Sequence, residues 1–126
     1  MRRAALATLA RVAPHVRGDL TIVLAGDGFI RKLNRRYRRQ DRATDVLSFE
    51  IGAGCAAGEP FGDVVISVET ARRQAKQYDA DVRTEMLRLL VHGTLHLCGY
   101  DHKGRTEAAR MGALTSRLLQ TLQSHV

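Results

Sequence analysis

Residues 86–97 place the strongest constraint on the fold, because they are apolar almost all the way round a helix. A helix of that kind is normally buried. At about 100° per residue, the polar side chains fall on one narrow stripe made of Glu85, Arg88, His92 and His96. Buried polar groups need partners. We therefore expect this stripe to line a cleft rather than to face bulk solvent.

Three histidines in and after this helix have a spacing that suits a metal ion. His92 and His96 are four residues apart, so they lie one turn apart on the same helix face. Gly99 suits a left-handed helix end, and the turn after it can bring His102 back to the same point. Three neutral imidazoles with a fourth position open to water are the layout of a catalytic zinc site. The sequence thus predicts one zinc ion bound by His92, His96 and His102.

This spacing matches the zinc signature of the metzincin proteases, H-x-x-x-H-x-x-G-x-x-H. Those proteases carry a glutamate general base after the first histidine, whereas this chain has Gly93. The ligands of the motif are present and its base is absent, so a metalloprotease is kept only as an alternative function. Cys98 lies beside the site but points away from His92 and His96 on the helix, and we leave it out of the ligand set.

The charge of the chain favours an anionic partner. The formal net charge is +7, and 17 of the 20 cations are arginines, whose planar fork suits phosphate. Residues 31–42 hold seven cations against one acid, Asp41. Such a dense segment would contact phosphates whatever the nucleic acid sequence. Nucleic acid is therefore the expected partner.

The length and composition indicate the class of protein. A chain of 126 residues is long enough for one domain with a substantial core. No apolar run approaches the length needed to span a bilayer, so we expect no membrane partner. Two cysteines are too few for a disulfide framework. We interpret both as reduced thiols, and we expect a cytoplasmic protein.

The mixed order of strands and helices predicts an α+β or α/β fold in a single domain over residues 1–126, and of the two we expect α+β. We expect a small mixed β-sheet of about four strands packed with about five helices, with the zinc-site helix at a cleft. Strands are expected near residues 20–24, 44–49 and 61–68, the last two as an antiparallel hairpin. We expect a first helix within residues 1–16 that ends near Pro14, and further helices over residues 29–38, 69–78, 81–97 and 106–122.

Some details of these helices are also predicted. Asp27 is a candidate cap for the second helix, and Asp81 is the expected cap of the zinc-site helix. The side chains expected to face inward are Leu6, Leu9 and Val12 in the first helix, and Phe29, Ile30, Leu33 and Tyr37 in the second.

Four blocks of the chain form a recognisable set: His92-Gly-Thr-Leu-His-Leu-Cys-Gly-Tyr-Asp-His102, Leu33-Asn34…Tyr37-Arg38, Thr44-Asp-Val-Leu-Ser-Phe49 and Gly62-Asp-Val-Val-Ile-Ser67. They resemble the blocks of the YbeY-type endoribonucleases, the rRNA maturation factors. The blocks occur in the family's order, and the resemblance covers roughly residues 19 to 122. The histidine block is the most specific of the four. One departure is Glu50, where the family usually has proline.

The resemblance implies a zinc-dependent, single-strand-specific endoribonuclease that acts in rRNA maturation and ribosome quality control. Its partners would be single-stranded RNA or rRNA and the ribosomal small subunit with its associated proteins. The family's zinc ligands carry over onto His92, His96 and His102, and its functionally important arginine carries over onto Arg38, which would bind the scissile phosphate. Asp101 either orients a ligand or is a turn residue and helix cap. A non-catalytic, ribosome-associated zinc protein remains a further alternative.

Overall fold

The computed structural model describes residues 1–100 and 104–123, and it confirms an α+β fold. The helices and strands follow one another in the order α1 (Arg2–Val12), β1 (Asp19–Ala25), α2 (Asp27–Arg38), β2 (Val46–Glu50), β3 (Pro60–Ser67), α3 (Val68–Gln77), α4 (Val82–Leu97) and α5 (Arg105–Gln123). Across the described residues the sheet has three strands rather than about four. The longest segment between two of these elements, between β2 and β3, is a glycine-rich and alanine-rich loop that lacks strand-forming residues.

The sheet is mixed, with the strand order β1-β3-β2. β1 runs parallel to β3, with Ile22 opposite Val64. β2 runs antiparallel to β3, with Leu47 opposite Val65, which confirms the predicted hairpin. Three consecutive residues of the central strand, Val64 to Ile66, are buried, so both faces of the sheet are covered there. β2 is an edge strand, so only one of its two edges pairs with another strand, and its residues can line a cleft.

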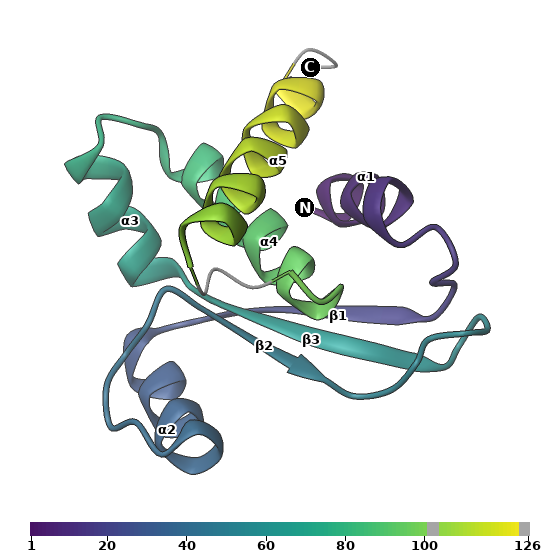
Figure 1. The fold of residues 1–126 in the computed structure, drawn as a ribbon. Coiled ribbons are helices and arrows are strands. Elements are labelled where there is room, and N and C mark those ends of the chain that lie inside the picture. The colour runs from purple at the N-terminus through teal and green to yellow at the C-terminus, as the bar shows by residue number, and fades with distance from the viewer. Residues whose placement is uncertain (101–103, 124–126) are drawn as a thin grey trace.

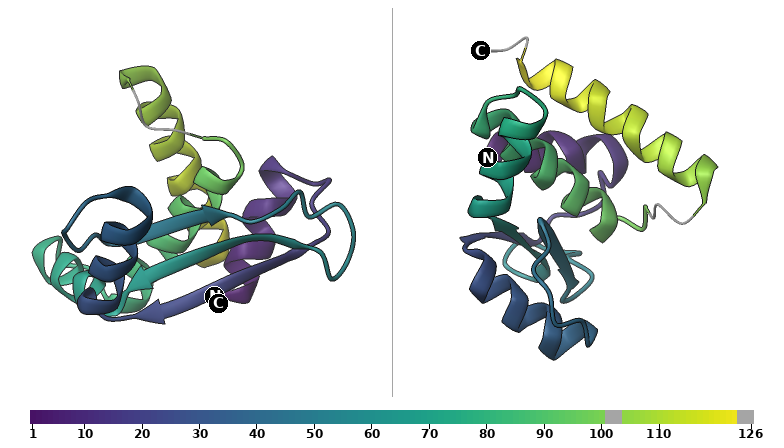
Figure 2. Two further views of the ribbon diagram at one scale, coloured as in Figure 1. Left: turned by 90° about the horizontal axis from the view of Figure 1, so that it is seen from below. Right: turned by 90° about the vertical axis from the view of Figure 1, so that its left-hand side faces the viewer.

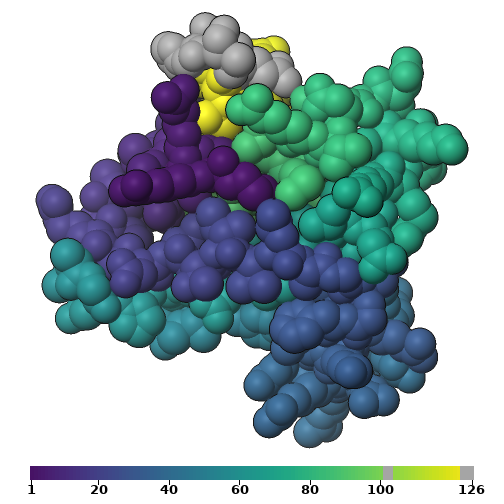
Figure 3. Space-filling view, turned by 180° about the vertical axis from the view of Figure 1, so that it is seen from behind, coloured from purple at the N-terminus to yellow at the C-terminus, as the bar shows by residue number. Residues whose placement is uncertain are grey.

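Helices cover the two faces of the sheet unequally. α1, α3, α4 and α5 lie on one side, and α2 lies alone on the other (Figure 1). α4 packs directly on the sheet, and α5 lies beyond it as the outermost element (Figure 2). Seen from behind, the segment of α2 projects below the rest of the molecule (Figure 3). In the part of the chain that is described, no helix has both the length and the apolar character needed to cross a membrane.

Both ends of α4 agree with the prediction. The carboxylate of Asp81 accepts a hydrogen bond from the Thr84 amide at 2.7 Å, which is the expected N-terminal cap. After the helix, Gly99 adopts a left-handed backbone with φ of +94°. Between these ends, Leu89, Leu90 and other apolar side chains are fully buried. The helix that carries the histidines is thus fixed along its length.

Three side chains predicted to face inward are instead exposed: Leu6, Phe29 and Tyr37, with 56%, 51% and 58% of their surface accessible. In α1, small residues such as Ala5 pack against the core, which places Leu6 on the outer side. α2 crosses the sheet alone and buries only Ile30 and Asn34. The contact with the sheet is therefore too narrow to bury Phe29 and Tyr37 as well.

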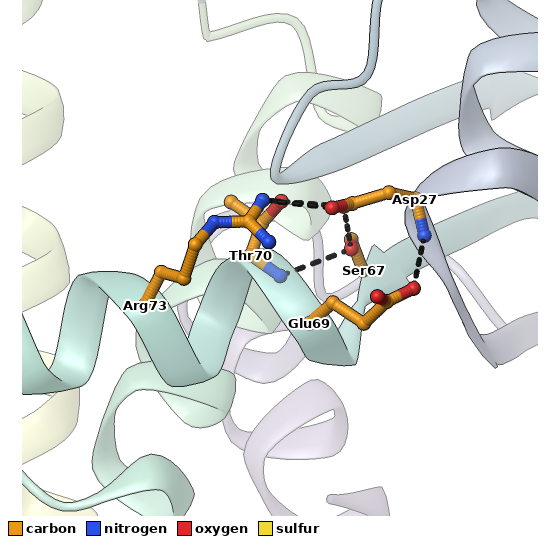
Figure 4. A network of polar contacts seen from close by, with 5 residues as sticks. All are labelled: Asp27, Ser67, Glu69, Thr70 and Arg73. Carbon is orange, nitrogen blue, oxygen red and sulfur yellow. Dashed lines mark hydrogen bonds and ion pairs between the residues drawn. The ribbon is translucent and has the colours of Figure 1, made fainter.

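Asp27 does not cap its own helix, contrary to the prediction. Its carboxylate accepts hydrogen bonds from the hydroxyls of Ser67 at 2.5 Å and Thr70 at 2.7 Å, and from Arg73 at 2.8 Å (Figure 4). These bonds, with that from Ser67 the largest cause, lower the pKa of Asp27 from 3.8 to about 2. In return, Glu69 accepts a bond from the Asp27 amide at 2.9 Å. The network ties the beginning of α2 to the beginning of α3.

Candidate functional site

A cleft of about 720 Å³ runs along β2, between the end of α2 and the C-terminal half of α4. It is lined by Asn34 and Arg38 of α2, by Gln40, Arg42, Thr44 and Asp45 of the following segment, by Val46 to Glu50 of β2, and by His92, His96 and Leu97 of α4. Residues far apart in the sequence are therefore brought together at one edge of the sheet. The predicted polar stripe of α4 does line a cleft through its two histidines.

His92 and His96 face each other within this cleft. Their ring centroids are 4.8 Å apart, with an angle of 69° between the ring planes, and both side chains are half-buried. This arrangement follows from the four-residue spacing on a regular helix. The other two predicted site residues near them, Asp101 and His102, lie outside the described residues. The structure thus brings together two of the three predicted zinc ligands.

The donor chemistry of this pair fits a transition-metal ion. Neutral imidazole nitrogens suit zinc and related ions, and two of them on one helix face can bind the same ion. Over residues 1–100 and 104–123, no group of three His, Cys, Asp or Glu side chains is arranged to hold a metal. Cys98 does not line the cleft, and burial raises the pKa of its thiol. It therefore stays outside the ligand set.

The rest of the polar stripe is already paired. Glu85 is only 4% exposed, and Arg88 donates to both of its carboxylate oxygens. The hydrogen bonds from Arg88 to Glu85 raise the pKa of the Arg88 guanidinium, so the pair holds opposite charges that balance. The two charged residues therefore satisfy each other one to two turns before the histidines.

Gly93 packs against the sheet instead of facing the cleft. A Cβ atom at this position would come within 2.7 Å of Val64 Cγ1 and 3.0 Å of Ser48 Oγ. No glutamate side chain fits there without moving the helix away from β2 and β3. The position at which metzincins carry their general base is thus unusable for a base in this fold, which argues against the metalloprotease alternative.

Arg38, the last residue of α2, reaches the same cleft from the opposite side. One of its terminal nitrogens donates a hydrogen bond to the Ser48 carbonyl at 2.6 Å. Its guanidinium carbon lies 5.5 Å from the centre of the Phe49 ring. These two contacts hold an otherwise exposed side chain in one place. The predicted phosphate-binding residue therefore lines the same cleft as the two histidines.

Ser48 links these two sides, and sequence reasoning did not single it out. Its hydroxyl donates to the Gly93 carbonyl at 2.8 Å, while its own carbonyl accepts the bond from Arg38. The signal was present in the alternation of β2: Val46 and Ser48 face α4, while Leu47 and Phe49 pack with the core under α2. A serine at an inward-facing position of a strand needs a polar partner, and here the partner is the histidine helix.

The cleft contains charges of both signs. Arg38 and Arg42 supply cations, and Asp45 and Glu50 supply carboxylates. Asp45 accepts from the Val46 amide at 2.8 Å and from the side-chain amide of Gln74 at 3.3 Å. The strongly positive surface lies along the exposed side of α2 and just after it. There Arg31 forms an ion pair with Asp41, and the other exposed cations are Lys32, Arg35, Arg36 and Arg39.

Comparisons with known proteins identify the family. The chain forms an α+β domain in which two histidines and an arginine line one cleft. The sequence model of the family described as "Endoribonuclease YbeY" matches residues 2–123. The chain belongs to the YbeY endoribonuclease family.

Individual relatives agree with this assignment. The chain is similar to the Endoribonuclease YbeY of Myxococcus xanthus, with 50% identity over 104 residues, 80% of this chain and 35% of that protein. It is 43% identical to the Heliobacterium modesticaldum protein over 81% of this chain and 68% of the relative. It is also 43% identical to the Aquifex aeolicus protein, over 82% of this chain and 70% of the relative. The chain thus spans about a third of the first relative's length and just over two thirds of the other two.

A solved structure supports the fold. The solution structure of a Thermotoga maritima protein is similar with a TM-score of 0.63 and 22% sequence identity. The match covers 98% of this chain and 82% of that one. At this identity the likeness concerns the fold alone.

Proposed function

We propose that residues 1–126 form one zinc-dependent endoribonuclease domain that cuts single-stranded RNA. The observation that carries the proposal is the cleft that joins His92 and His96 on α4 to Arg38 on α2. Family membership supports RNA as the substrate. We further propose that the protein acts in rRNA maturation and ribosome quality control in the cytoplasm, with the ribosomal small subunit and its associated proteins as partners.

The proposed zinc ligands are His92, His96 and His102, with Asp101 orienting one of them. When bound, zinc supplies Lewis acidity, which polarises a phosphoryl oxygen and makes water more acidic. α4 contributes rigidity, because its buried faces fix the backbone from which both described histidines project. The bond from Ser48 to the Gly93 carbonyl fixes the helix directly after His92. The positions of His92 and His96 are therefore set before substrate binds.

Arg38 binds and orients the scissile phosphate in this proposal. Its hydrogen bond to Ser48 and its position over Phe49 hold the guanidinium at the cleft. A guanidinium carries five N–H donors, so donors remain for the phosphate oxygens. Because the group is held in position beforehand, the negative charge that grows in the transition state is stabilised without reorganisation. The cations along α2 would hold the flanking backbone.

The test is cleavage of a labelled single-stranded RNA by metal-stripped protein, before and after one equivalent of zinc is added. We expect zinc to restore cutting in the wild-type chain and to have no effect in the His96→Ala variant. One-to-one zinc binding without any cleavage would contradict the proposed endoribonuclease activity and favour a non-catalytic zinc protein. Cleavage that persists without metal would contradict the zinc site.

A further inference from the structure

Tyr37 is an exposed aromatic residue that the proposed mechanism does not use. It lies in the last turn of α2, one residue before Arg38, and 58% of its surface is accessible. Single exposed apolar side chains are common and need no explanation. Phe29, on the same helix, is almost equally exposed at 51%. Exposure alone therefore does not distinguish Tyr37.

What distinguishes Tyr37 is its contact with the wall of the cleft. Its ring centre lies 5.5 Å from that of Phe49, with the two rings edge to face at 68°. Phe49 lines the cleft, and the Arg38 guanidinium lies over its ring, 5.5 Å from the ring centre. The Arg36 guanidinium lies 5.4 Å from the centre of the Tyr37 ring. The two aromatic rings and the two arginines thus form a continuous surface, which reaches the histidine cleft at Arg38 and Phe49.

This surface combines the two features that bind single-stranded nucleic acid. Such sites use cations that follow the backbone and aromatic rings on which bases stack. The surrounding cations of α2, Lys32 and Arg35 among them, are exposed and match a polyanion. An apolar protein segment would gain little from a ring set among so many charges. Charge complementarity therefore points to a base within an RNA strand.

We propose that Tyr37 stacks on a nucleobase of single-stranded RNA, next to the phosphate that Arg38 binds. The assignment rests on the proposed function and specifies it further, because it gives the cleft a binding site for the nucleotide beside the scissile bond. Phe49 holds the Tyr37 ring from one side, so little side-chain freedom is lost when a base stacks on it. Arg36 contacts the phosphate of the stacked nucleotide. Stacking explains a preference for single strands, because bases within a duplex already stack on each other.

The test is a double-mutant cycle between the side chain and the base. Binding of a labelled single-stranded RNA of about ten nucleotides is measured by fluorescence anisotropy, with a chelator present to prevent metal-dependent cleavage. The proteins are the wild type and the Tyr37→Ala, Tyr37→Phe and Phe29→Ala variants. Each is also tested on strands in which one nucleotide after another is made abasic.

We expect Tyr37→Ala to weaken binding about 5- to 100-fold, and Tyr37→Phe and Phe29→Ala to change it less than about twofold. On the strand that is abasic at the stacked position, the wild type and Tyr37→Ala should bind equally. Equal binding of intact RNA by both proteins would overturn the proposal. So would a loss that persists on every abasic strand, because it would show a structural role for Tyr37.

These results are distinguishable from failure of the proposed function. That function fails if the zinc-loaded wild-type chain does not cut RNA. The stacking site fails if the wild type binds and cuts RNA while Tyr37→Ala matches it on intact strands.

Discussion

The two helices that meet at the cleft differ in almost every physical respect. α4 is buried on most of its surface and contacts the sheet, α1, α3 and α5. α2 lies alone on the opposite face, is strongly charged, and buries only Ile30 and Asn34. Under the proposed function, the buried helix would hold ligands at fixed positions for a metal ion, while the exposed helix would present cations and a ring to RNA.

The first prediction tests whether α4 contributes more than α2 to the stability of the fold. Leu90 on α4 is fully buried, so Leu90→Ala should lower the free energy of unfolding by about 2–5 kcal/mol through lost burial and a cavity. Phe29→Ala on α2 removes a larger but half-exposed side chain and should cost less than about 1 kcal/mol. Urea denaturation of both variants measures the difference. Similar losses would show that α2 is as much a part of the core as α4.

The second prediction concerns the charged helix. Arg38→Ala should reduce kcat for RNA cleavage about 100-fold, equivalent to about 2.7 kcal/mol, because the phosphate loses a preorganised donor. The unfolding free energy should change little, since the side chain is exposed. Arg72→Ala, which removes an exposed arginine of α3 that does not line the cleft, is the matched control and should retain nearly full activity. Equal losses in both variants would indicate a general charge effect instead of a specific site.

The third prediction compares a glycine on each helix. Gly93→Ala should destabilise the protein by about 1–3 kcal/mol, because the new methyl group meets the stiff Val64 side chain at 2.7 Å. Zinc affinity should fall with it, since the helix between the histidines must shift. Gly28→Ala on α2 adds a methyl group where nothing lies within 4 Å. It should be neutral or stabilise by about 0.5 kcal/mol, as thermal unfolding of both variants would show.

The smallest effect concerns how α2 is attached. Because the folded pKa of Asp27 lies at about 2, below its ordinary 3.8, its stabilising contribution is present above about pH 4. It is lost as the pH falls from 4 towards 2. Asp27→Asn should therefore cost about 1 kcal/mol at pH 7, and the difference from the wild type should shrink to near zero at pH 2. A difference that is independent of pH between 7 and 2 would contradict the network of Figure 4 as its cause.

The sequence predicted the buried helix better than the exposed one. The limits of α4, the Asp81 cap, the left-handed Gly99 and the cleft at His92 and His96 all followed from periodicity and local backbone chemistry, and the structure confirms them. Such features depend on residues close in the sequence. On α2, Tyr37 was placed inside the protein, because periodicity does not reveal how wide a surface a single helix covers.

The contacts that join α2 to the rest of the molecule were beyond sequence reasoning. Ser48 joins Arg38 to the histidine helix through one hydrogen bond from its hydroxyl and one to its carbonyl. Asp27 bonds to Ser67 and Thr70, forty residues or more away. Both depend on strand order and register, which no local pattern specifies. The number of strands, predicted as about four and found to be three among the described residues, likewise depends on topology. His102 and Asp101 remain predictions, since they lie outside the described residues.

The proposed function assigns the metal to α4 and the RNA to α2, as separable functions of one cleft. The most direct test measures zinc binding and single-stranded RNA binding for the wild type, His96→Ala and Arg38→Ala. We predict that His96→Ala loses zinc but binds RNA in chelator within about twofold of the wild type. Arg38→Ala should keep zinc and bind RNA about tenfold more weakly. If either substitution removed both activities together, or if His96→Ala kept its zinc, the division between the two helices would be wrong.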